Sequence, residues 1–126
     1  MVDLYHMLDD AEASFITMLE RFAAEKLAPK ATETDESARF VHDQLAALAE
    51  TGMMGANLPE AWGGADISAQ ALLHAVSVIA GGCGSTVSAL TAHYLATDSI
   101  LVGGDDALRA RYLPDAATGA KLGAFG

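Results

Sequence analysis

The sequence predicts an all-helical domain, a bundle of about six helices that ends in the start of an unpaired strand. Apolar residues recur at intervals of three and four along several segments, which is the spacing of a helix with one buried face. Capping side chains, prolines and glycines separate these segments. The 126 residues are 52% hydrophobic, which is enough apolar material for one packed core.

The first helix is predicted over residues 9–28, with Asp9 or Asp10 as its N-cap. Its buried face is expected to contain Phe15, Met18, Leu19, Phe22 and Leu27. Pro29 disfavours helical geometry at the residue before it, so the helix is expected to end there. A polar connector over residues 31–36 should follow.

A second helix is predicted over residues 38–51, and Gly52 suits a left-handed stop after it. Its buried face is expected to contain Val41, Leu45 and Leu48. Proline and three glycines exclude a regular helix from residues 53–66. Because Leu58 and Trp62 are apolar, this loop is expected to fold back onto the core.

The third helix is predicted over residues 69–80, with Ser68 as its cap and a glycine cluster after it. The fourth, over residues 86–102, is apolar on more than one side, which is typical of a central helix. His93 within it is predicted to be a hydrogen-bonded core histidine. Cys83, just before it, is predicted to be a small buried residue.

An aspartate pair can cap a short fifth helix that runs through Leu113, and Pro114 suits the first position of a sixth helix ending at Gly119. Residues 122–126 are apolar, contain glycines and lack a helical period. They read as the start of a strand. A strand needs a partner to be stable, so we expect this one to pair with residues outside the chain.

Charge and motifs exclude several functions. Seventeen acidic residues against seven basic ones give a net charge of −10, which repels nucleic acid and anionic membrane surfaces. The single cysteine fits a reducing compartment, so a cytoplasmic location is expected. The four histidines lack metal-ligand spacing, and the sequence has neither a phosphate-binding loop nor a nucleophile elbow. No metal ligand and no catalytic residue is predicted.

Several segments in a fixed order resemble the N-terminal domain of the acyl-CoA dehydrogenases, and together they extend over nearly the whole chain. They are residues 45–55 (LAALAETGMMG), residues 58–64 (LPEAWGG), residues 82–86 (GCGST), His93, Ile100, Gly103, Gly104, Arg111-Tyr112-Leu113-Pro114 and Gly119. Each motif is modest alone, and their order and spacing carry the resemblance.

The resemblance implies a flavoenzyme larger than this chain. Residues 1–126 would be the N-terminal helical domain, with a middle β-domain and a C-terminal helical domain absent from them. The whole enzyme would bind FAD and dehydrogenate an acyl-CoA thioester between its α- and β-carbons, with the glutamate base in the C-terminal domain. The implied partners are an electron-transfer flavoprotein as acceptor and further copies of the subunit in a homodimer or homotetramer. This fragment alone would be inactive.

The resemblance also implies a role for particular residues. Aligned from the glycine–cysteine pair, the family's acyl-chain positions fall on Val87, Ser88, Thr91 and Leu95. Helical spacing places these four on one side of the fourth helix. Phe125 falls where the family's first strand approaches the flavin.

Three alternatives stay open at this point. The four helix residues could pack against other helices instead of a substrate. The complete protein could be an acyl-CoA oxidase or a flavin monooxygenase, because the residues that separate these enzymes lie outside the chain. The chain could also be a stand-alone helical binding module that shares only the fold.

Overall fold

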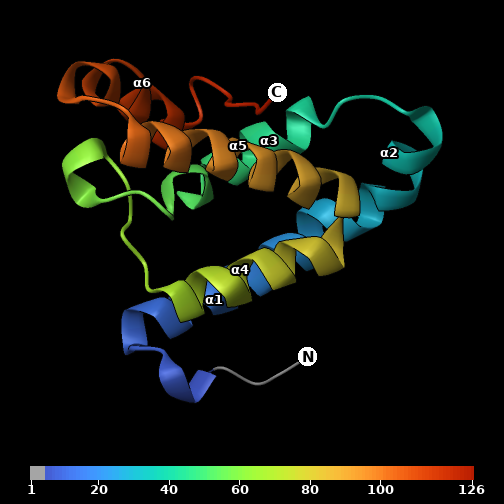
Figure 1. Cartoon of the computed structure of the whole chain (residues 1–126). Helices are drawn as coiled ribbons and strands as arrows, with labels where there is room; N and C mark the ends of the chain where they lie inside the picture. The colour runs from blue at the N-terminus through green and yellow to red at the C-terminus, as the bar shows by residue number, and fades with distance from the viewer. Residues whose placement is uncertain (1–4) are drawn as a thin grey trace. The chain divides into compact units, whose positions relative to one another are not determined.

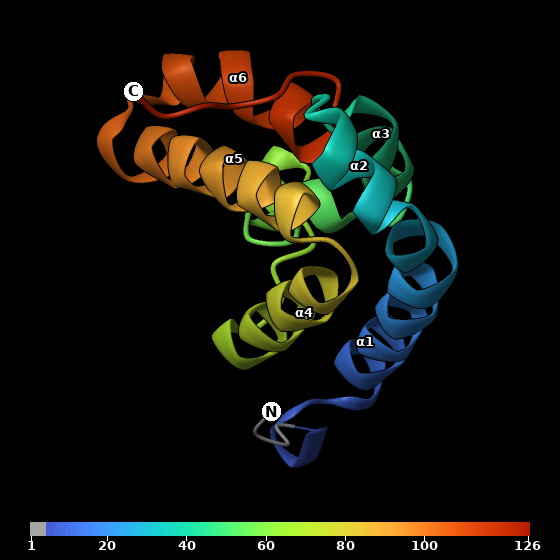
Figure 2. The same cartoon turned by 90° about the vertical axis from the view of Figure 1, so that its right-hand side faces the viewer.

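The computed structural model describes residues 5–126, and it confirms the all-helical class, with no strand in that range. The chain divides into two compact units. The described part of the first unit is residues 5–41 and 67–87, and the second unit is residues 42–66 and 88–126. Figure 1 and Figure 2 show the helices of each unit from two directions.

The first unit is built on two neighbouring helices, α1 (Asp10–Phe22) and α4 (Ala69–Gly82), which contact each other along their lengths (Figures 1 and 2). After α1 the chain stays helical through a π-turn at Ala23–Leu27 and a 3-10 turn at Ala28–Lys30. It then enters the short helix α2 (Ala31–Ser37). Because α2 was not predicted as a helix, the predicted third helix corresponds to α4.

The core of the first unit lies between α1, the π-turn and α4. Its buried residues are Ile16, Leu19, Ala23, Leu27, Ala71, Ala75 and Ile79. Gly82 permits the close approach, because a Cβ atom there would lie 3.1 Å from the Cβ atoms of Ala23 and Leu27. The predicted face of the first helix was wrong in one respect: Ile16 is buried, whereas Met18 is 38% exposed.

The prediction that Pro29 ends the first helix was wrong, as was the connector predicted over residues 31–36. Pro29 lies in the first turn of the 3-10 segment Ala28–Lys30, where its missing N–H costs no hydrogen bond. The break comes later, at Ala38, whose φ of 52° is left-handed. The second predicted helix accordingly begins only at His42.

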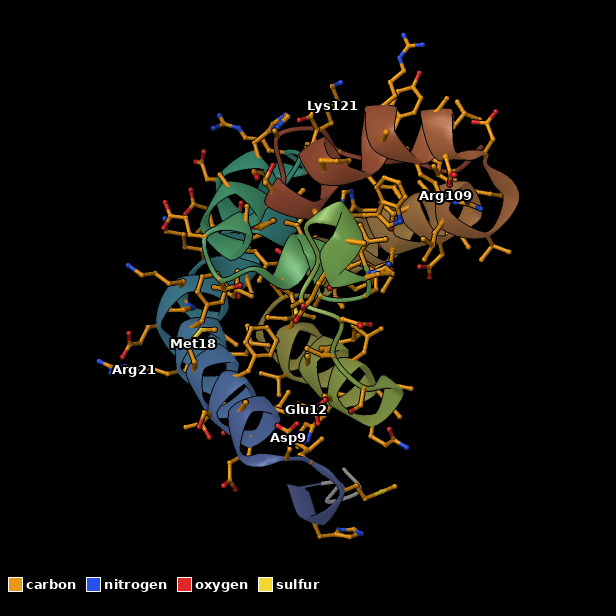
Figure 3. The ribbon with its side chains drawn as sticks, turned by 90° about the vertical axis from the view of Figure 1, so that its left-hand side faces the viewer. Asp9, Glu12, Met18, Arg21, Arg109 and Lys121 are labelled. Atoms are coloured by element: carbon orange, nitrogen blue, oxygen red, sulfur yellow. The ribbon has the colours of Figure 1, made fainter. Side chains whose placement is uncertain are left out.

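Polar side chains fasten the beginning of α1 to the beginning of α4, as Figure 3 shows for Asp9 and Glu12. Asp9 caps α1 by accepting the Glu12 N–H at 2.7 Å, which confirms one of the two predicted caps. One carboxylate oxygen of Glu12 accepts the Ser68 N–H at 2.7 Å. This hydrogen bond lowers the pKa of Glu12 below 4.5. Ser68 caps α4 as predicted.

The second unit contains the remaining elements. They are α3 (His42–Ala49), 3-10 turns at Met53–Gly55 and Glu60–Trp62, most of α5 (Gly84–Gly103), and α6 (Asp106–Thr118). The first four residues of α5 belong to the first unit. Both 3-10 turns contact α6. The loop predicted to fold back onto the core therefore does so.

The end of the second unit differs from the prediction of two short helices. Pro114 lies inside α6 instead of starting a new helix, and α6 ends at Gly119 in a left-handed conformation. Proline lacks the N–H that would bond to Ala110, but the helix continues for four more residues to Thr118. Residues 122–126 are irregular, because no strand among the described residues is there to pair with them.

A compact apolar cluster holds the second unit together. Leu58 from the loop is fully buried against Leu113 and Ala117 of α6. The half-buried side chains of Trp62, Ile100 and Leu101 pack around these three. Arg109 joins α6 to the end of α5, since its Nε donates to the Leu101 carbonyl at 2.8 Å (Figure 3).

Candidate functional site

One side of α5 is exposed, and we call it the outer stripe. It consists of Ser88, Thr91, Leu95, Ser99 and Val102. Successive members lie three or four residues apart, so they share one face of the helix. Leu95 is 51% exposed and Val102 is 83% exposed. The opposite face is buried and consists of Thr86, Leu90, His93, Tyr94 and Thr97.

Three of the four predicted acyl-contact residues, Ser88, Thr91 and Leu95, lie on the outer stripe and are exposed. Val87 is half-buried at the edge of the stripe. The structure thus brings these four residues together on adjacent turns of α5. It leaves Phe125 on the irregular tail, where the side chain is 63% exposed.

Two of the three hydroxyl groups of the outer stripe already donate a hydrogen bond within α5. The Thr91 Oγ1 donates to the Ser88 carbonyl at 3.1 Å, and the Ser99 Oγ donates to the Leu95 carbonyl at 2.7 Å. Both hydrogen atoms are therefore used within α5. With these donors satisfied, and with the Leu95 side chain between them, the stripe can lie against an apolar chain.

The buried face of α5 is anchored to the loop of residues 53–66 by hydrogen bonds. The Tyr94 hydroxyl donates to the Met53 carbonyl, and burial raises the pKa of this phenol, with the nearby Asp98 charge as a second cause. The Asn57 amide nitrogen donates to Thr97 Oγ1 at 3.1 Å and to Asp98 Oδ1 at 2.7 Å. These contacts hold α5 in a defined rotation, which keeps the outer stripe outward.

His93 is the core histidine that the sequence predicted. It is fully buried, and both ring nitrogens have partners. Nε2 lies 3.1 Å from the carbonyl oxygens of Met54 and Ala116, and Nδ1 lies 2.9 Å from the Gly123 nitrogen. Burial lowers its pKa below 6.5, and its hydrogen bonds to the two carbonyls oppose this shift. Cys83 is also buried, as predicted.

Over residues 5–126, no cluster of three or more His, Cys, Asp or Glu side chains is arranged to hold a metal ion. Within the same range, no helix combines the length and the apolar character needed to cross a membrane. The outer stripe contains no titratable side chain. Its chemistry is that of a surface for contact.

Sequence reasoning missed how the loop and the tail reach α5. Asn57 contacts residues 40 and 41 positions away, and Gly123 contacts His93 across 30 positions. Neither pair has a local sequence signal. The asparagine two residues before a proline and the glycine in the apolar tail are typical of turns, and turn residues carry no information about a distant partner.

Comparison with known proteins gives one consistent family. The family model for the N-terminal domain of acyl-CoA dehydrogenases matches residues 9–120. The short-chain-specific acyl-CoA dehydrogenase of Clostridium acetobutylicum is 33% identical over 110 residues, which are 86% of this chain and 29% of that protein. An acyl-CoA dehydrogenase of Bacillus subtilis is 32% identical over 111 residues, again 86% and 29%.

A solved structure shows the same likeness in three dimensions. Butyryl-CoA dehydrogenase from Megasphaera elsdenii superposes with a TM-score of 0.86 at 28% identity, over 94% of this chain and 32% of that one. This chain therefore spans less than a third of the length of each of these three relatives.

Proposed function

Because the chain belongs to the acyl-CoA dehydrogenase family, as its N-terminal domain, we propose that it serves a flavoenzyme that dehydrogenates an acyl-CoA thioester between the α- and β-carbons. In this proposal the outer stripe of α5 forms one wall of the slot for the acyl chain. The observation that carries it is the exposure of Ser88, Thr91 and Leu95 on one face, with Leu95 half exposed to solvent.

The proposed role of the stripe is to select the acyl chain by burial. Each methylene group that leaves water gains about 0.8 kcal/mol, so the depth of an apolar slot sets the chain length that binds best. The small side chains of Ser88 and Thr91 leave room beside the helix, and Leu95 lies one turn beyond them. We therefore propose that Leu95 limits the length of the acyl chain on this wall.

The described residues fit a contact with FAD at one point only. Phe125 offers an exposed aromatic ring, and the residues that would hold the cofactor's phosphates are expected in the rest of the complete protein. When bound, FAD would accept the hydride. No part of that step is assigned to residues of this chain, and Phe125 is proposed only as an apolar contact near the flavin.

The remaining proposals concern the complete protein. The family resemblance supports an electron-transfer flavoprotein as the electron acceptor and a homodimer or homotetramer as the assembly. A cytoplasmic location is proposed from the single cysteine of residues 1–126, which cannot form a disulfide within this part of the protein.

The proposed activity is tested on the purified product of the complete reading frame that contains this chain. We expect a yellow protein whose flavin absorbance bleaches when an acyl-CoA such as butyryl-CoA is added without oxygen. Bleaching followed by rapid recovery in air would indicate an acyl-CoA oxidase. A colourless protein that gains no absorbance after incubation with FAD would contradict the proposal and favour the binding module.

The proposed wall is tested by Leu95→Phe. The larger ring should fill the end of the slot, so kcat/KM for a long acyl-CoA should fall about tenfold more than for a short one. The matched control is Leu108→Phe on α6, because Leu108 is 44% exposed and Leu95 51%. An unchanged ratio in Leu95→Phe, or the same change in both variants, would contradict the assignment of the stripe.

A further inference from the structure

His93 is tied to three separate segments of main chain. Its imidazole reaches Met54 in the loop, Ala116 in α6 and Gly123 in the tail, at 3.1, 3.1 and 2.9 Å. The sequence separations are 39, 23 and 30 residues. One buried side chain therefore joins α5 to three other segments, and the bond to Gly123 is the one that involves the tail.

The partners decide which ring nitrogen carries the proton. Gly123 contributes an N–H, so Nδ1 must accept with a lone pair. Met54 and Ala116 contribute carbonyl oxygens, so Nε2 must carry a hydrogen atom. The two oxygens share this one hydrogen atom. The neutral Nε2–H tautomer satisfies all three contacts. A second proton would have to sit on Nδ1, where it would face the Gly123 N–H and break that bond.

The tail is closest to α5 at Gly123. A Cβ atom at Gly123 would lie 2.8 Å from the Ala96 Cβ and 3.5 Å from the His93 Nδ1. The tail therefore packs directly on the ring, and only glycine fits this position. Two residues later comes Phe125, and the tail over residues 122–126 has no regular secondary structure to hold that side chain.

The titratable groups near His93 are not causes of the shift of its pKa. On α5 the titratable neighbours are Tyr94 and Asp98, and on α6 and the tail they are Asp115 and Lys121, which pair with each other at 3.0 Å. None of them is a cause of the shift at His93, which comes from burial and from the two carbonyls. The turn Met53–Gly55 contains no titratable side chain. The response to pH is therefore that of the imidazole itself.

We propose that His93 is a pH-sensitive latch, which holds the tail and positions Phe125 only while the imidazole is neutral. The latch is a property of the fold. Its effect on a bound flavin through Phe125 rests on the proposed function. A folded-state pKa below 6.5 means that the unfolded chain takes up the proton first, so stability is complete above pH 6.5 and is lost as the pH falls from there toward the folded-state pKa.

Amide hydrogen exchange of the full chain tests the latch without flavin or substrate, so its result is separate from that of the proposed function. We expect the protection factor of the Gly123 amide to fall about tenfold as the pH falls through the range in which His93 takes up a proton. The exchange rates are first corrected for the intrinsic rate at each pH. The Cys83 amide, which bonds to the Ile79 carbonyl at 3.0 Å, is the internal control and should stay protected.

Two variants distinguish the hydrogen bond at Nδ1 from the hydrogen bonds at Nε2. His93→Asn places an acceptor where Nδ1 lies and does not titrate, so Gly123 should stay protected at every pH. His93→Gln keeps a donor near Nε2 but loses the acceptor, so Gly123 should exchange rapidly at every pH.

Nitrogen-15 NMR of the unmodified chain gives a check that needs no variant to fold, since it reads the protonation state of each ring nitrogen. Nδ1 should be unprotonated at neutral pH, and it should gain its proton over the pH range in which Gly123 loses protection. Constant protection of Gly123 through the titration of His93, or a proton on Nδ1 at neutral pH, would overturn the proposal.

Discussion

Gly64→Ala is expected to destabilise the second unit by about 3–5 kcal/mol, the range of the most severe single substitutions. A Cβ atom at Gly64 would overlap the Leu58 carbonyl oxygen and lie 2.6 Å from the Leu58 Cβ. The carbonyl cannot move away cheaply, because it accepts the Asp66 N–H at 2.9 Å. Relief of the clash would require the fully buried Leu58 side chain to leave the core.

Urea unfolding followed by Trp62 fluorescence measures this effect, because Trp62 is the single tryptophan and packs against the same cluster. The control is Gly81→Ala in α4 of the first unit, where an added Cβ meets nothing within 4 Å. Its unfolding is followed by circular dichroism, because Trp62 lies in the second unit. Alanine is favoured over glycine inside a helix by about 0.5–1 kcal/mol, so this variant should be slightly more stable. Equal midpoints for the two variants would show that the close approach at Gly64 is not as described.

Leu113→Ala is expected to lower the free energy of unfolding by about 2–5 kcal/mol, through lost burial and the cavity left behind. Leu113 is fully buried between Leu58 and Ala117, and the half-buried Trp62 covers the same cluster. The surrounding side chains come from the loop, α5 and α6, so a collapse into the cavity would have to move all three.

The same helix offers the control. Leu108→Ala in α6 removes the same atoms from a side chain that is 44% exposed, and it should cost less than about 1 kcal/mol. Both variants are read by urea unfolding with fluorescence and circular dichroism. A loss at Leu108 as large as that at Leu113 would contradict the assignment of the core.

Local signals predicted most of the helices correctly. Asp9 and Ser68 were predicted as caps, and each accepts the backbone N–H three residues ahead. Gly52 and Gly119 were predicted to end helices, and both are left-handed. The candidate site residues came from the family resemblance, and helical spacing added only that Ser88, Thr91 and Leu95 share one face.

The errors concerned helix ends next to prolines and the choice of the buried residues on the first helix. Pro29 and Pro114 were predicted to divide helices, but each is accommodated within a helical segment. Pro29 lies in the first turn of its segment, where no hydrogen bond is lost. Pro114 removes one hydrogen bond inside α6, and neighbouring packing decides whether the helix continues in spite of that loss. Likewise, Ile16 and Met18 are both apolar, and only the position of α4 decides that Ile16 is the buried one.

The sequence by itself determined the helical class, most of the caps and stops, and the family, because these depend on residue types at short spacing. Only the tertiary structure decided which residues meet across 30 to 41 positions: His93 with Gly123, and Asn57 with Asp98. The physical reason is that a periodic pattern specifies that one side of a helix is buried. The pattern does not specify which element covers that side, and a main-chain partner such as the Gly123 N–H leaves no mark in the sequence, because every residue except proline carries this group.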